Sequence, residues 1–173
     1  MKTVRWFCAA AVVAALAAPA APAQDFPKPG PEHELLKKYV GTWDLTMKFG
    51  GMESKGTVTY KMDLGGLWLV SALESEFAGQ KFSGRGMDSY DAAKKKYVGV
   101  FFDNMGTSPL VMEGTFDKEK KALTMVGDGP GMDGKPTKYK IVTEWKDDDT
   151  VHVSMFMGGG SDQACTGVYK RRK

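Results

Sequence analysis

A short helical pattern gives way to a strand within the stretch Leu35-Leu36-Lys37-Lys38-Tyr39-Val40-Gly41-Thr42-Trp43-Asp44. Residues 32–40 are typical of a helix, because acids come first, bases come last and the apolar side chains fall on one face. We expect Gly41 to end this helix. From Trp43 onward, apolar residues recur at every second position, which indicates a half-buried strand. The stretch therefore predicts a short helix followed directly by the first strand of a sheet.

The rest of the chain continues as alternating segments separated by turn residues. Turn signals rich in Gly and Asp recur roughly every 8 to 12 residues. No helical pattern intervenes, and the long crossover of a Greek key is missing. We therefore expect an all-β, antiparallel, up-and-down barrel of about ten strands, a size that leaves an internal cavity. The predicted strands are 43–49, 57–64, 67–77, 82–90, 96–103, 110–116, 122–126, 137–145, 151–157 and 164–170.

The N-terminus has the pattern of a signal peptide. Lys2 and Arg5 precede an apolar run at residues 6–18, and an A-x-A cleavage site ends at Ala23. We predict a signal peptide over residues 1–23, cleaved near Ala23. No later stretch reaches the roughly 20 apolar residues that a spanning helix needs. The mature protein is therefore expected to be secreted or periplasmic, without an integral membrane segment.

The composition and charge of the mature chain limit its possible domain organisation and partners. Residues 24–31 form a Pro-rich leader, and residues 32–173 are long enough for a single β-barrel domain. Without Lys2 and Arg5, the 24 basic residues fall to 22 against 21 acidic residues, so the charge gives no reason to expect nucleic acid as a partner. Cys165 is then the one remaining cysteine, which excludes an intramolecular disulfide.

The segment Gly41-Thr42-Trp43 resembles the opening Gly-x-Trp signature of the calycin superfamily, which includes lipocalins, fatty-acid-binding proteins and nitrobindin-like barrels. In lipocalins this tryptophan closes the base of the barrel, and a basic residue of the last strand covers it. The resemblance therefore implies a barrel closure built from Gly41, Trp43 and Arg171.

Most of the mature chain is also similar to an uncharacterised bacterial family, domain of unknown function 1579, which is grouped with calycin-like barrels. The resemblance implies a fold and no established reaction. Nitrobindin-like barrels hold haem through a histidine of the final strand. Residues 163–169 contain none, so no cofactor is expected unless Cys165 serves as a thiolate ligand. The shared pieces are Gly30-Pro31-Glu32-His33, Val40-Gly41-Thr42-Trp43-Asp44, Leu64-Gly65-Gly66, Phe82-Ser83-Gly84-Arg85-Gly86, Tyr90-Asp91, Lys95-Lys96-Tyr97-Val98, Met105-Gly106-Thr107 and Met112-Glu113-Gly114-Thr115.

The candidate site residues lie on the predicted barrel wall. A charged side chain inside a barrel is costly unless it is paired or solvated, so inward charges would form a polar patch able to orient a ligand. Arg85 and Glu113 are the main candidates for this patch, and an outward position or a structural ion pair is the alternative. Glu74, Asp103 and Glu144 are further strand charges. The apolar candidates for ligand binding are Tyr60, Phe101, Met112 and Trp145.

We hypothesise that the protein is an exported barrel whose expected partner is a small, largely apolar ligand. Two alternatives stay open: an enzyme that uses an interior polar patch for acid-base chemistry, and a structural envelope protein with a filled interior. We predict no catalytic residue and no metal site, since neither His33 nor His152 has a partner at a useful spacing. The inward or outward phase of each strand decides which residues line the site.

Overall fold

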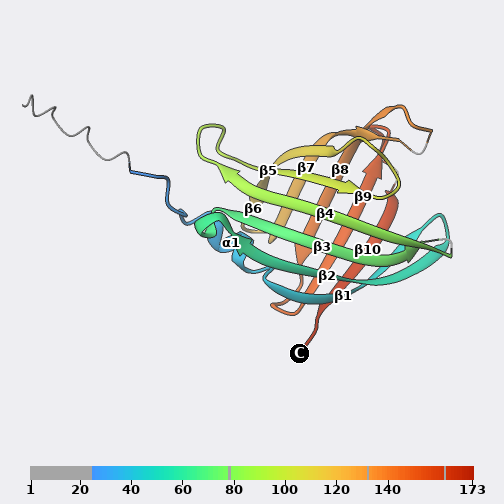
Figure 1. The fold of residues 1–173 in the computed structure, drawn as a ribbon, viewed down its shortest axis with the longest axis horizontal. Coiled ribbons are helices and arrows are strands. Elements are labelled where there is room, and N and C mark those ends of the chain that lie inside the picture. Colours follow the sequence, from blue (N-terminus) through green and yellow to red (C-terminus); the bar gives the residue numbers. More distant parts are fainter. Residues whose placement is uncertain (1–24, 78, 132, 162) are drawn as a thin grey trace, which may run out of the picture.

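The computed structural model describes residues 25–77, 79–131, 133–161 and 163–173. The predicted signal peptide lies outside these residues. The described chain forms one short helix and ten strands (Figure 1). Their bounds are α1 His33–Lys37, β1 Gly41–Phe49, β2 Met52–Asp63, β3 Trp68–Phe77, β4 Gln80–Asp91, β5 Lys96–Asp103, β6 Leu110–Asp117, β7 Ala122–Pro130, β8 Pro136–Trp145, β9 Thr150–Met157 and β10 Gln163–Arg171, with a single 3-10 turn, Leu64–Gly66, between β2 and β3.

The ten strands close into one antiparallel barrel. Each strand pairs with its neighbours in sequence, and β1 pairs with β10 from Trp43 opposite Arg171 to Phe49 opposite Cys165. This confirms the predicted all-β, up-and-down barrel of about ten strands. The helix spans His33–Lys37 and is therefore shorter than the predicted 32–40. In the part of the chain that is described, no helix has the length and hydrophobicity needed to cross a bilayer.

Aspartate-led turns join several strands. Asp91 accepts hydrogen bonds from the backbone N–H groups two and three residues later, and Asp117 does the same after β6. Lys95 and Lys121 then adopt positive φ values of 54° and 49°. A turn followed by one left-handed residue is a common short hairpin connection. These local contacts make tight hairpins and exclude long crossovers.

The pairing register fixes the direction of every side chain. Trp43, Leu45 and Met47 of β1 point inward, and residues directly opposite one another on neighbouring strands share a face. Inward residues near the α1 end form the packed core of the barrel. Its buried members are Leu35, Leu36, Tyr39, Trp43, Leu45, Val58, Leu69, Tyr97, Leu123, Met125, Trp145 and Val151.

The helix α1 lies against one end of the barrel (Figure 1). Leu35 and Leu36 are buried there. The Tyr97 hydroxyl donates a hydrogen bond to the Glu32 carbonyl at 3.1 Å, and the Gly30 N–H donates to Nδ1 of buried His33 at 3.1 Å. These contacts fix α1 as a plug. The other end of the barrel carries the β1–β2, β3–β4, β5–β6, β7–β8 and β9–β10 connections.

Candidate functional site

Trp43 lies at the floor of the barrel, next to the plug helix. Its side chain is 1% exposed, and its indole N–H donates a hydrogen bond to the Tyr39 carbonyl at 2.7 Å. The Arg171 guanidinium lies over the indole ring, 4.1 Å from its centroid. A cation held against a tryptophan face is attracted by the ring quadrupole. The first strand and the last strand therefore meet through these two side chains.

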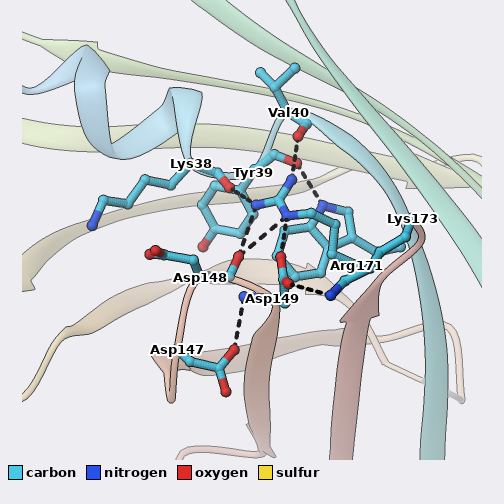
Figure 2. Close-up of polar contacts among 9 residues, drawn as sticks. Lys38, Tyr39, Val40, Asp147, Asp148, Asp149, Arg171 and Lys173 are labelled. Atoms are coloured by element: carbon cyan, nitrogen blue, oxygen red, sulfur yellow. Dashed lines mark hydrogen bonds and ion pairs between the residues drawn. The ribbon is translucent and has the colours of Figure 1, made fainter.

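Arg171 also ties the plug to the β8–β9 turn (Figure 2). Its Nη1 donates to the Val40 carbonyl at 2.6 Å, and its Nη2 donates to the Lys38 carbonyl at 2.8 Å. From the turn, the Asp148 carbonyl accepts from Nη2 at 3.0 Å, and the Asp149 carboxylate lies 3.1 Å from Nε. One planar guanidinium thus holds the plug, β10 and the β8–β9 turn together.

Gly41 allows this arrangement but does not end α1. The helix stops four residues earlier, at Lys37, so our expectation of a glycine cap is wrong. Gly41 instead opens β1 with a φ of 124°, which a residue with a side chain rarely adopts. A Cβ atom here would lie only 3.1 Å from Nη1 of Arg171. Glycine therefore lets the guanidinium reach the plug carbonyls.

Above this floor the barrel encloses a cavity of about 400 Å³. Leu36 and Tyr39 bound it at the plug end, while Ser108 and Pro130 line it at the opposite end. Its volume falls within the range of roughly 300–1,000 Å³ that is typical of small-molecule sites. Most of its lining is apolar or aromatic, including Met47, Val58, Leu69, Leu73, Phe82, Leu110, Leu123, Met125, Ile141, Val153 and Met155.

The four apolar candidates from the sequence all point into the barrel. Tyr60, Phe101 and Met112 line the cavity. Trp145 lies deeper, in the core, where its ring packs edge-on against Tyr39 with centroids 4.9 Å apart. Its buried indole N–H has no hydrogen-bond partner among the described residues. Three of the four candidates can therefore touch a ligand directly, and Trp145 supports the floor.

Arg85 and Glu113 lie on the outer face, so our hypothesis that they form an interior polar patch is wrong. Arg85 faces outward with Ala72, its partner on β3, and pairs with Glu74 at 2.8 Å. Glu113 pairs outside with Lys96 and, at 3.3 Å, with Lys94. Hydrogen bonds from both lysines lower the pKa of the Glu113 carboxyl. Strand alternation explains the result, because both residues are one position out of phase with the inward set.

Asp88 of β4 places a carboxyl group inside the barrel. It lies opposite Leu69 and Gly99, on the inward phase, at the boundary between core and cavity. Gly99 makes room for it, since a Cβ atom there would lie 2.2 Å from Oδ1 of Asp88. Burial raises the pKa of Asp88 to about 7. A carboxyl group removed from water favours its neutral form, so this one changes charge near neutral pH.

Tyrosine hydroxyls share the interior with Asp88. Burial raises the pKa of Tyr39 and of Tyr60, and the Asp88 charge raises both further. Burial also raises the pKa of Tyr169 to about 12. Ser71 lines the same cavity, from the strand next to Asp88. The interior therefore combines an apolar wall with two carboxyl groups, those of Asp88 and Asp103, and several neutral hydroxyls.

Sequence reasoning missed Asp88 although a signal for it was present. Gly84, Gly86, Asp88 and Tyr90 alternate along β4, and an aspartate in phase with an aromatic residue is a candidate for the inner face. Gly84 and Gly86 weaken the apolar periodicity, so the pattern does not show which face of this strand points inward.

Asp103, one of the further strand charges named from the sequence, also points inward and lines the cavity.

A family model described as a protein of unknown function, DUF1579, matches residues 28–171. The chain belongs to the DUF1579 family. A comparison with curated proteins finds no match.

Solved structures similar to this DUF1579 member are β-barrels. The S-type phycobiliprotein lyase of Guillardia theta superposes with a TM-score of 0.56 at 10% identity, covering 82% of this chain and 93% of the lyase. A de novo designed fluorescence-activating β-barrel gives a TM-score of 0.48 at 14% identity, covering 79% of this chain and 96% of the design. At this level of identity, the likeness to the lyase shows the fold alone.

The outer wall of this DUF1579 barrel carries a second concavity. It measures about 930 Å³ and lies over β5 to β8. Val111 and Val126 are exposed there, between the charged side chains of Glu113, Asp128 and Lys138. Many of its lining side chains point outward, and it is open to solvent. The interior cavity is the better candidate site, since it alone combines enclosure with a buried ionisable group.

Proposed function

We propose that this protein is an exported, calycin-like barrel that binds a small, largely apolar molecule inside the barrel. The observation that carries the proposal is the cavity of about 400 Å³, lined mainly by apolar and aromatic side chains. Burial of apolar surface stabilises a bound ligand by roughly 25 cal/mol per Å² before the costs of association.

The closed floor supports a binding role. Trp43, Arg171 and the plug helix seal one end, so a ligand would enter from the end where Ser108 and Pro130 line the cavity. A single entrance is suited to holding a molecule and unsuited to conducting one. The up-and-down topology with a Trp–Arg closure supports the calycin-like assignment, and the signal-peptide pattern of residues 1–23 supports secretion or a periplasmic location.

The two alternatives receive less support. The enzyme hypothesis required Arg85 and Glu113 inside the barrel, and both lie outside. The structural hypothesis required a filled interior, whereas the cavity is many times larger than the space one water molecule needs. Binding is therefore the function that the geometry supports best.

Titration with the neutral dye N-phenyl-1-naphthylamine tests the proposal. We expect saturable binding of one dye per chain, seen as an increase in dye fluorescence. Ser71→Phe places a ring inside the cavity and should weaken binding by about tenfold or more. Ala72→Phe is the matched control, because the neighbouring residue faces outward, opposite Arg85, and it should leave the affinity unchanged.

Two results would contradict the proposal. One is an absence of saturable dye binding to the parent protein. The other is equal affinity of the parent and Ser71→Phe, which would place the dye outside the barrel. Native mass spectrometry of protein recovered from its own host gives an independent test, since a bound ligand adds a non-covalent mass.

A further inference from the structure

The charged groups that line the cavity are all acidic. Among the described residues that line it, Asp88 and Asp103 are carboxylic acids, and none is lysine, arginine or histidine. Asp103 has a local partner, because its Oδ1 accepts a hydrogen bond from the Met105 N–H at 2.9 Å. No protein cation therefore balances either acid from within the cavity wall.

Among the described residues, no hydrogen bond or ion pair reaches the Asp88 carboxyl group, and burial alone accounts for its raised pKa. The residue is only partly buried, and because Asp88 points inward, its accessible surface faces the cavity. Buried polar groups nearly always have a partner, and an unpaired buried charge is costly. The carboxyl group is thus placed to receive a partner from a molecule inside the barrel.

Tyrosine rings line the same cavity as this carboxyl group. The Asp88 charge raises the pKa of Tyr39 and of Tyr60, whose ring centroids are 5.3 Å apart. Tyr90 follows Asp88 on the same face, with its centroid 5.2 Å from that of Tyr97. Aromatic faces attract organic cations, most strongly where water is excluded. A cavity that offers both a carboxylate and tyrosine rings has the chemistry of an ammonium site.

We propose that the ligand is an amphiphilic amine, whose ammonium group pairs with Asp88 while its apolar portion extends through the cavity toward Ser108 and Pro130. This inference rests on the proposed binding function and adds the chemical class of the ligand. A charge-assisted hydrogen bond to Asp88 favours the amine over a neutral alcohol of equal length by about tenfold or more.

The pairing makes affinity depend on pH. In the free protein, Asp88 carries a proton below pH about 7, and an ammonium ion displaces this proton when it binds. Amine affinity should therefore fall about tenfold between pH 8 and pH 6. The other titratable groups that line the cavity are Asp103 and five tyrosines, Tyr39, Tyr60, Tyr97, Tyr139 and Tyr169. Burial raises the pKa of each tyrosine, so their hydroxyls stay neutral between pH 6 and pH 8.

Displacement of N-phenyl-1-naphthylamine by decylamine, decan-1-ol and decanoate provides the test. For the parent protein at pH 8 we expect decylamine to bind at least about tenfold more tightly than decan-1-ol, with decanoate weakest. In Asp88→Asn the preference for the amine and its pH dependence should disappear, while decan-1-ol still binds. Asp128→Asn, on the outer face of β7, is the control with an intact cavity.

Each other outcome counts against the inference. Equal affinity for amine and alcohol, or a preference that survives in Asp88→Asn, would overturn the ammonium site while leaving a binding barrel in place. If the preference for the amine were lost in Asp103→Asn and kept in Asp88→Asn, the ammonium group would pair with Asp103, and the assignment to Asp88 would be wrong. Failure of every decyl compound to displace the dye would overturn this inference, and failure of the dye itself to bind would overturn the proposed function. Unchanged dye affinity in Asp88→Asn shows that the variant is folded.

Discussion

Replacing Asp88 by asparagine should stabilise the barrel at alkaline pH and have little effect at acidic pH. The pKa of Asp88 is about 7 in the folded barrel, against 3.8 for an ordinary aspartate. Between these values the folded state retains a proton that the unfolded chain has lost, so the free energy of unfolding falls as pH rises. The difference of about 3 pH units corresponds to about 4 kcal/mol. This loss is complete above pH 7 and absent below the unfolded pKa.

Urea unfolding followed by tryptophan fluorescence measures this effect. The free energy of unfolding of Asp88→Asn, relative to the parent, should increase by about 4 kcal/mol between pH 4 and pH 8. Asp128→Asn is the control, because Asp128 forms an exposed pair with Lys138, and such pairs contribute at most about 1 kcal/mol. A difference between Asp88→Asn and the parent that stays constant from pH 4 to pH 8 would refute the placement of Asp88 in a water-poor interior.

Three further substitutions test the floor and the close contact at Asp88, all by urea unfolding. Trp43→Ala should cost about 3 to 5 kcal/mol, because a buried indole and its hydrogen bond to Tyr39 are lost; an unchanged unfolding midpoint would show that Trp43 does not close the barrel. Arg171→Lys should cost about 2 to 3 kcal/mol, since an ammonium cannot reach all the acceptors that the guanidinium spans; full stability would contradict the role of Arg171 in holding the plug. Gly99→Ala should cost about 1 to 3 kcal/mol by pressing on Asp88, and the cost should shrink in the Asp88→Ala background, whereas additive effects would argue against the contact.

Much of the fold could be predicted because its signals are local. Strand alternation and turn residues indicated ten strands, and each predicted strand overlaps an observed one. The predicted end of the helix at Val40 is wrong: Val40 continues the apolar face, but the helix ends at Lys37. Its side chain instead lies exposed, while its carbonyl accepts from Arg171, a residue 131 positions away. Such a long-range partner leaves no local signal.

The interior site was only partly predictable, because the phase of a strand is a property of its neighbours. Tyr60, Phe101 and Met112 lie on strands whose large apolar residues mark the inner face. Arg85 lies on β4, where Gly84 and Gly86 stand in place of large apolar residues. The pattern of this strand is therefore equally compatible with an inward Arg85 and an inward Asp88. The register with β3 and β5 decides for Asp88. Charge alone gave no indication of which acid lacks a partner.

The most direct test of a ligand-binding interior is the crystal structure of the protein with bound N-phenyl-1-naphthylamine. We expect electron density for the dye inside the barrel, between Tyr39 at the floor and Ser108 at the opposite end. An interior without dye density, with the dye seated instead on the outer concavity beside Val111 and Val126, would contradict this expectation.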